Sequence, residues 1–162
     1  MVSTPCTISN TVSLNSIYDN DELGIDLVDD ADPTNAVTPN GSGPNGANRL
    51  QNYPILSEVL TDSSSIYISG ALTGTANSQF ALEFFTNETC DATGFGEGRT
   101  FLISDTITTD GTGEATFSLT TNASADVALT ATATDAGGNT SEFSNCLIAV
   151  SYTHLRAHET SN

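Results

Sequence analysis

The chain has 162 residues, and 20 acidic side chains against three basic ones give it a formal net charge of −17 at pH 7. Phosphate recognition needs clustered cations, so this composition excludes nucleic acid as a partner and disfavours anionic membrane surfaces. No apolar run is long enough to span a bilayer as a helix. The acidity suits a secreted protein in salty or calcium-bearing surroundings, although solubility alone explains it equally well.

The first segment, residues 1–28, is predicted to be a fragment of one rung of a right-handed parallel β-helix. Isolated apolar residues, Ile17, Ile25 and Leu27, are separated by polar residues and glycine that would turn the corners. One rung cannot bury its own apolar face, so we expect further rungs upstream in the same chain. The N-terminus also lacks the pattern of a signal peptide, which indicates an internal fragment of a longer protein. An irregular N-terminal strand is the alternative.

The second segment, residues 29–54, is acidic and rich in Pro, Gly and Asn. It contains little that could build a core, which predicts an extended polar linker. Structure is expected to resume near Leu50, where Tyr53 and Leu56 become available to pack.

Residues 55–149 alternate apolar and polar residues in short runs separated by turn-forming residues. This pattern predicts an all-β domain, an immunoglobulin-like β-sandwich of about seven strands. The predicted strands lie near residues 56–60, 65–72, 79–86, 100–108, 114–120, 126–134 and 141–149. The side chains predicted to share a face within each strand are Ile66, Ile68 and Leu72; Phe80, Leu82 and Phe84; Phe101, Ile103 and Ile107; Ala115, Phe117 and Leu119; and Val127, Leu129, Ala131 and Ala133.

The end of this domain is predicted to be a β-hairpin. An alternating run at 127–134 leads into a Gly-Gly-Asn turn and a returning strand that contains Cys146. Cys90 follows the third predicted strand, and the third and last strands of an immunoglobulin-like fold share a sheet. We therefore predict a Cys90–Cys146 disulfide, which would stabilise the folded state by roughly 4 kcal/mol in the chain-entropy model. Cys6 is left without a partner.

Acidic turns provide candidate calcium ligands. Calcium takes several oxygen ligands from carboxylates and carbonyls, which such turns can supply, but no segment matches the EF-hand pattern. We predict a calcium site at the junction between the β-helix fragment and the sandwich, with ordinary Asp turns as the alternative. The candidate ligands are Asp26, Asp29, Asp30, Asp32, Asp110, Asp135, Asn139 and Glu142.

The loop 90–101 contains a Gly-x-Gly-x-Gly spacing, which raises the question of a nucleotide site. The loop leads into a predicted strand, so no helix N-terminus is available for phosphate. A long sandwich loop is the better interpretation, with glycines at positive φ and with Glu97 and Arg99 paired to each other or to a partner.

Residues 150–162 differ from the rest of the chain and are predicted to be a non-native tail. Residues 150–160 resemble the translation of a transposase-type sequencing adapter, and such segments are excluded from fold arguments. The tail contains both histidines, His154 and His158, whose i, i+4 spacing would otherwise suggest a metal site. Without the tail, the chain has no histidine for general acid–base chemistry.

Several segments together resemble the C-terminal part of large secreted bacterial proteins in which right-handed β-helix repeats precede an immunoglobulin-like or fibronectin-like module. These segments are 15–27, 50–56, 90–101 and 141–146. The run 133–140 is also similar to the closing hairpin of tandem immunoglobulin-like repeats in adhesins. The resemblance implies a secreted or cell-surface scaffold, and it carries over no catalytic motif.

We therefore expect a non-enzymatic, extracellular or cell-surface structural or adhesion module that caps and extends a β-helix surface protein. Two alternatives stay open: a carbohydrate-binding accessory module of a polysaccharide-degrading β-helix enzyme, and a calcium-dependent adhesion domain. Exposed aromatic residues on one sandwich face would favour sugar binding, whereas clustered carboxylates at the junction would favour calcium. The expected partners are upstream rungs of the same chain and surface, matrix or polysaccharide components. No cofactor other than calcium is expected.

Overall fold

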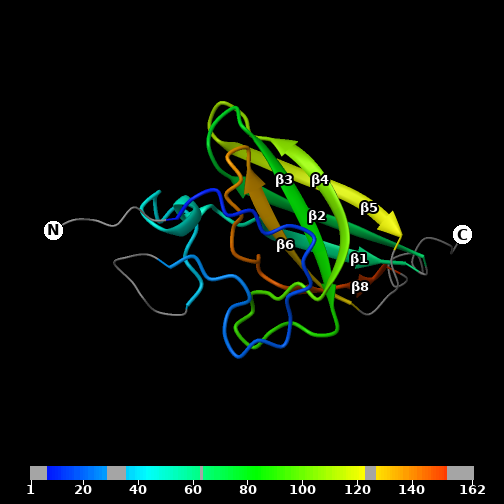
Figure 1. Ribbon diagram of the computed structural model, residues 1–162. Coiled ribbons are helices and arrows are strands. Elements are labelled where there is room, and N and C mark those ends of the chain that lie inside the picture. Colours follow the sequence, from blue (N-terminus) through cyan, green and yellow to red (C-terminus); the bar gives the residue numbers. More distant parts are fainter. Residues whose placement is uncertain (1–6, 29–35, 63, 123–126, 153–162) are drawn as a thin grey trace, which may run out of the picture.

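Two four-stranded β-sheets face one another (Figure 1). The computed structural model describes residues 7–28, 36–62, 64–122 and 127–152. Within these ranges one sheet has the strand order β5-β2-β1-β8 and the other has the order β4-β3-β6-β7. Neighbouring strands are antiparallel, except for β1 and β8. The strands are β1 (Ile55–Thr61), β2 (Ser65–Thr73), β3 (Gln79–Asn87), β4 (Thr100–Thr108), β5 (Glu114–Asn122), β6 (Ala128–Asp135), β7 (Leu147–Ile148) and β8 (Val150–Ser151).

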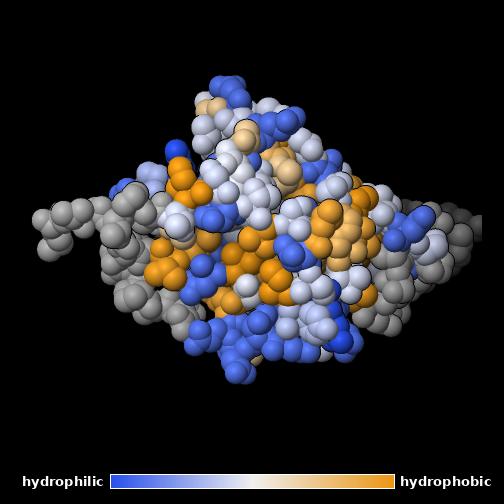
Figure 2. Space-filling view, in the orientation of Figure 1, coloured by the Kyte–Doolittle hydropathy of each residue, from blue (hydrophilic) through white to orange (hydrophobic). Residues whose placement is uncertain are grey.

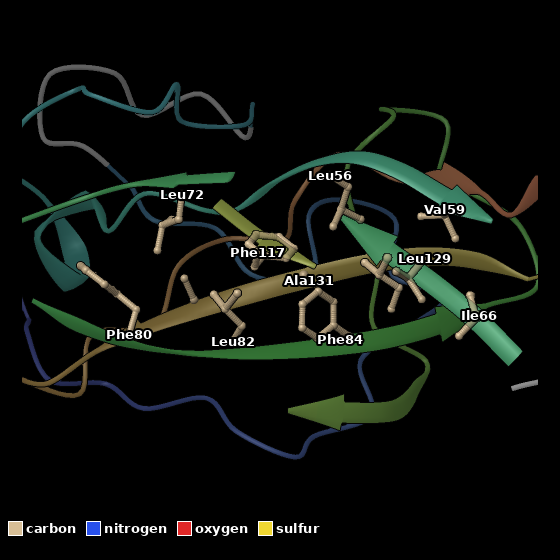
Figure 3. Packing of buried hydrophobic residues seen from close by; sticks show 12 residues of the cluster. Leu56, Val59, Ile66, Leu72, Phe80, Leu82, Phe84, Phe117, Leu129 and Ala131 are labelled. Carbon is tan, nitrogen blue, oxygen red and sulfur yellow. The ribbon is translucent and has the colours of Figure 1, made fainter. Parts of the chain in front are cut away.

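The core between the sheets is built from the alternating apolar side chains of the strands, which confirms the prediction of an all-β sandwich. Figure 3 shows Phe80, Leu82 and Phe84 of β3 pointing into the space between the sheets. The rings of Phe84 and Phe117 meet edge to face with their centroids 5.6 Å apart. The buried cluster consists of Leu56, Val59, Ile66, Ile68, Leu72, Phe80, Leu82, Phe84, Phe117, Leu129, Ala131 and Ala133.

The prediction that Phe101 shares a face with Ile103 and Ile107 is wrong. The β3–β4 ladder shifts register between Phe84 and Phe85, so that Phe101 pairs with Phe85. Such a β-bulge sets two residues of one strand opposite one residue of the other and breaks the alternation of faces. As a result, Phe85 and Phe101 meet on the outer face of the sheet, with their ring centroids 6.1 Å apart.

The predicted last strand, 141–149, is wrong in its first half. Regular strand is limited to β7, and the preceding residues follow β6 without a continuous ladder. The N–H of Ser141 donates to the carbonyl of Ala133. The next such contact joins Ser144 to Ala131, so three residues of this segment span two residues of β6 and a regular ladder cannot form. The two serine hydroxyls instead accept the N–H groups of these alanines, which completes the hydrogen bonding of β6.

The outer edge of β1 is covered in two places. The side-chain oxygen of Asn145 accepts the Leu56 N–H, and its side-chain nitrogen donates to the Leu56 carbonyl. An asparagine amide carries the donor and the acceptor of a peptide group, so it substitutes for a neighbouring strand at an edge that would otherwise be open. Farther along, β8 pairs in parallel with Leu60 and Thr61. This strand lies in the predicted tail 150–162, of which residues 153–162 lie outside the described residues.

Candidate functional site

Residues 7–28, here called the strap, lie across the outer face of the sheet that contains β3 and β6 (Figure 1). Ile17 of the strap and Gly98 exchange both backbone hydrogen bonds, at 2.8 and 2.9 Å. Residues 127–149, which contain β6, the Gly-Gly-Asn turn and β7, are here called the closing hairpin. Nearer the start of the strap, the N–H of Ser9 donates to the side-chain oxygen of Asn139 in the closing hairpin. The described part of residues 1–28 contains no strand, so the predicted β-helix rung is not confirmed there.

Glutamates of the sandwich hold the strap through their carboxylates. Glu83 of β3 is 9% exposed and accepts hydrogen bonds from the Ser13 hydroxyl and the Leu14 N–H. Glu97 accepts hydrogen bonds from both the backbone and the side-chain amide of Asn20. A segment without a ladder needs other partners for its N–H groups, and ionised carboxylates are strong acceptors. These contacts therefore fix the path of the strap.

Glu142 joins the strap to the segment 36–54 and is only 2% exposed. Its Oε1 accepts the N–H of Leu27, and its Oε2 accepts the N–H of Thr38, both at 2.9 Å. Thr38 also donates its hydroxyl to the Leu27 carbonyl. One carboxylate thus supplies the acceptors for two chain segments that lack regular structure.

The turn η1 (Ala47–Leu50) has an unusual backbone conformation. Asn48, Arg49 and Leu50 have φ of 47°, 56° and 47°, in the left-handed region that costs about 1–2 kcal/mol per non-glycine residue. The buried Asn48 side chain offsets this cost, because it accepts the N–H of Asn10 and donates to the carbonyls of Asn10 and Thr140. The turn therefore joins the strap, the segment 36–54 and the closing hairpin at one point.

Two glycines allow the strap to approach an aromatic cluster on the outer face of the sheet. Phe143 of the closing hairpin meets Phe85 edge to face, with ring centroids 5.6 Å apart. A Cβ added to Gly98 would lie 2.5 Å from the Phe143 ring, and one added to Gly24 would lie 2.8 Å from the Ile17 side chain. Glycine is therefore required at these two positions because there is no room for a side chain, and not because the backbone has a positive φ.

The candidate calcium ligands are distributed over several places. Within the described residues, no three His, Cys, Asp or Glu side chains are grouped so that they could hold one metal ion. Asp26 and Glu142 interact with each other, whereas the carboxylates of Asp110 and Asp135 accept N–H groups of their own turns. Asn139 belongs to the Asp135 turn. Calcium binding at the junction stays a prediction, because three candidates lie outside the described residues: Asp29, Asp30 and Asp32.

The pair formed by Asp26 and Glu142 has perturbed titration behaviour. Burial raises the pKa of Glu142, and the Asp26 carboxyl adds to the rise, although the N–H groups of Leu27 and Thr38 oppose it. Burial also raises the pKa of Asp26, helped by the charge of Glu22. One oxygen of Asp26 is buried and has no hydrogen-bond partner in the described residues. The protonated forms of Asp26 and Glu142 are therefore favoured more strongly in the folded state than in the unfolded state.

We expect the protein to be most stable at mildly acidic pH. Because the pKa values of Asp26 and Glu142 are raised on folding, their contribution is complete below the ordinary carboxyl range and is lost as the pH rises through the raised values. The pKa of Asp62 is lowered because the N–H groups of Ser64 and Ser65 donate to it, so its contribution is lost as the pH falls through that lowered value. The melting temperature should therefore rise as the pH falls from neutral towards the ordinary carboxyl range, at about pH 4, and should fall below that range. Glu142→Gln should flatten the rise, and an unchanged profile in that variant would contradict the assignment.

Cys90 and Cys146 form the predicted disulfide, with their Cα atoms 5.6 Å apart. The bond ties the loop after β3 to the residue that precedes β7. In the same loop, Glu97 and Arg99 do not pair with each other, which was one of the two predicted arrangements. Arg99 instead forms an ion pair with Glu88 at 3.2 Å, and Glu97 accepts hydrogen bonds from Asn20 of the strap.

Three residues whose side chains bind backbone groups of distant segments were not identified from the sequence: Glu83, Asn48 and Asn145. Glu83 occupies an outward position of an alternating strand, where a solvent-exposed acid is the ordinary expectation. The abundance of asparagine in segments without apolar periodicity was a usable signal. Such residues bind backbone groups when no ladder is available.

Within the described ranges, no helix has the length and apolarity needed to cross a membrane. The strap, the segment 36–54 and the closing hairpin meet through buried carboxylates and amides. No family model matches the chain, and no curated protein matches it either.

Proposed function

We propose that the chain is a non-enzymatic extracellular module that caps the end of a β-helix and extends it at the cell surface. The observation that carries this proposal is the attachment of the strap, which Glu83, Glu97 and Glu142 hold through hydrogen bonds. A chain that enters through such a segment is joined rigidly to the sandwich, in contrast to the flexible linkers that usually separate domains. Such a connection would fix the orientation of the sandwich relative to an upstream solenoid and would transmit mechanical force between them.

An immunoglobulin-like or fibronectin-like fold accounts best for the strand order. In such folds strands A, B and E share one sheet, while C, F and G share the other. Here β1, β2 and β5 lie in one sheet, and β3, β6 and β7 lie in the other with β4 beside β3. This order supports assigning β1 to β7 to strands A, B, C, C′, E, F and G. The fold class is shared by many surface modules, so it supports a scaffold role by analogy only.

The Cys90–Cys146 disulfide and the acidic composition support an extracellular location. Disulfides persist in oxidising compartments and are rare where thiols are kept reduced. A charge of −17 with no lysine suits surroundings in which cations screen the surface. The proposed partners are β-helix rungs upstream in the same chain, whose open end the strap and sandwich would cover against edge-to-edge pairing.

Gly98→Ala is expected to loosen the strap around Ile17 while the sandwich stays folded. The added methyl group would lie 2.5 Å from the Phe143 ring, so residue 98 has to move relative to that ring, and we expect this movement to weaken the Ile17–Gly98 bridge. Native-state hydrogen exchange should become at least about tenfold faster at the Ile17 N–H and stay unchanged in β2.

Gly111→Ala is the matched control, because nothing lies within 4 Å of a Cβ added there and its backbone is not left-handed. Its strap should exchange as slowly as that of the unmodified protein. Fast exchange throughout the strap of the unmodified protein would refute the rigid connection on which the proposed function rests.

A further inference from the structure

A polar pocket of about 320 Å³ lies where the strap meets the loop after β3. Figure 2 shows hydrophilic residues gathered at the lower edge of the molecule, where Figure 1 places these two segments. The volume is at the lower end of the range for small-molecule sites, and the proposed structural role makes no use of the pocket. Its lining includes Tyr18, Asn20, Glu88, Asp91, Glu97 and Arg99.

Covalent and hydrogen bonds fix the walls of this pocket. Cys90, which lines it, is one half of the disulfide. The Asn87 side chain donates to the Glu97 carbonyl and accepts the Arg99 N–H. Asn20 of the strap donates two hydrogen bonds to Oε1 of Glu97. A site held in this way loses little conformational entropy when a ligand binds.

The pocket contains both acceptors and donors that have no partner in the described residues. Asp91 uses Oδ1 to accept the N–H and the hydroxyl of Thr93, which leaves its Oδ2 unused. Glu97 uses only Oε1, in its contact with the strap. Arg99 directs one side-chain nitrogen at Glu88, and its remaining N–H donors have no protein acceptor there. A ligand that both accepts and donates hydrogen bonds can use all of these atoms.

Tyr18 adds an aromatic surface beside these polar groups. Its side chain is 44% exposed, and the guanidinium carbon of Arg99 lies 4.7 Å from its ring centroid. The cation–π contact and the ion pair with Glu88 together hold the guanidinium in place. An apolar ring next to fixed donors and acceptors accommodates a molecule that has both C–H faces and hydroxyl groups.

The charges in the pocket decide the class of ligand. An anion would be attracted by Arg99 but repelled by three carboxylates, those of Glu88, Asp91 and Glu97. A metal ion would be repelled by Arg99, and no three carboxylates of the described residues are grouped to share one. The hydroxyls of a neutral polyol donate to carboxylate oxygens and accept from a guanidinium at the same time. We propose that this pocket binds a neutral pyranose residue of an uncharged glycan.

The probes that test this proposal are the methyl glycosides of glucose, galactose and mannose. They are titrated into the intact oxidised protein while its backbone amide NMR signals are recorded, with galacturonic acid and glucosamine as anionic and cationic analogues. We expect saturable shifts at Asn20, Asp91 and Arg99 with at least one neutral glycoside, and at least about tenfold weaker binding of both charged analogues. Absence of saturable shifts with every neutral glycoside, equal or tighter binding of a charged analogue, or shifts centred elsewhere would overturn the proposal.

The variant Asp91→Asn separates binding from folding. Asparagine retains the oxygen that accepts the two Thr93 donors, but it replaces the unused acceptor by an NH₂ donor. The melting temperature should stay unchanged, while the affinity for the neutral glycoside should fall at least about tenfold, because a hydroxyl loses a charged acceptor. If the variant is destabilised, Tyr18→Ala provides a second readout, because that side chain is exposed and its loss removes the aromatic surface together with its cation–π contact to Arg99.

Asp110→Asn is the matched control for Asp91→Asn. Asp110 accepts the N–H and the hydroxyl of Thr112 at 2.8 and 2.7 Å, the same distances that Asp91 has to Thr93, and it lies outside the pocket. It should bind the neutral glycoside with unchanged affinity. Equal affinities of Asp91→Asn, Tyr18→Ala and the unmodified protein would show that the glycoside binds elsewhere and would overturn the proposal.

Discussion

The double variant Cys90→Ser/Cys146→Ser is expected to lose roughly 4 kcal/mol of unfolding free energy relative to the oxidised protein. The bond links residues 56 positions apart, and a cross-link over that distance removes much chain entropy from the unfolded state. The folded chain has little to replace it, because β7 is only two residues long. Urea denaturation in a Cys6→Ser background, which leaves no third thiol for exchange, measures the difference.

The same variant also reports where the disulfide acts. Because Cys90 lies in the loop after β3, hydrogen exchange should accelerate first in that loop and in β7, while the β2–β5 ladder stays protected. Reduction of the unmodified protein should reproduce the loss measured for the double variant. A difference below about 1 kcal/mol would show that the loop and the hairpin are held mainly by their hydrogen bonds.

Alternation located the strands wherever regular strands pair with each other. The strand β4 occupies the predicted residues 100–108, and the predicted inward positions of β2 and β3 are buried. The disulfide followed from the same reasoning, since both cysteines adjoin strands that share a sheet. The local alternation of apolar and polar residues is therefore sufficient to predict the paired strands of the sandwich and the buried faces of β2 and β3.

The attachment of the strap depends on contacts that no local pattern contains. Glu142 accepts a hydrogen bond from Leu27, 115 positions away, and Glu83 accepts one from Ser13, 70 positions away. The bulge lies in β4, where Leu102 has no partner in the register, and the apolar run Phe101, Leu102 and Ile103 satisfies a period-two pattern on either face. The sequence therefore identified the sandwich but not the side chains that hold the strap to it.

Glu142→Ala is expected to lower the free energy of unfolding by about 3 kcal/mol at neutral pH. The substitution removes the acceptor of the Leu27 and Thr38 N–H groups, and each orphaned donor costs about 1–3 kcal/mol. The Thr38 contact is only partly buried and the repulsion from Asp26 disappears, so the sum stays well below the upper limit. Urea denaturation measures the loss, and hydrogen exchange should become faster at the two amides named. Glu58→Ala, an exposed glutamate on β1, is the control and should change stability by less than about 0.5 kcal/mol.

Glu142→Gln distinguishes the two opposing effects of this carboxylate. Glutamine retains an acceptor for one N–H but presents an NH₂ group to the other, so hydrogen bonding alone predicts a loss of about 1–2 kcal/mol. Burial and repulsion from Asp26 act in the opposite direction, because glutamine is uncharged. If that effect dominates, glutamine will stabilise the protein at neutral pH. A loss would establish that Glu142 is needed as an acceptor that binds the strap and the segment 36–54 together, whereas a gain would mean that the strap is held chiefly by Glu83, Glu97 and the aromatic cluster.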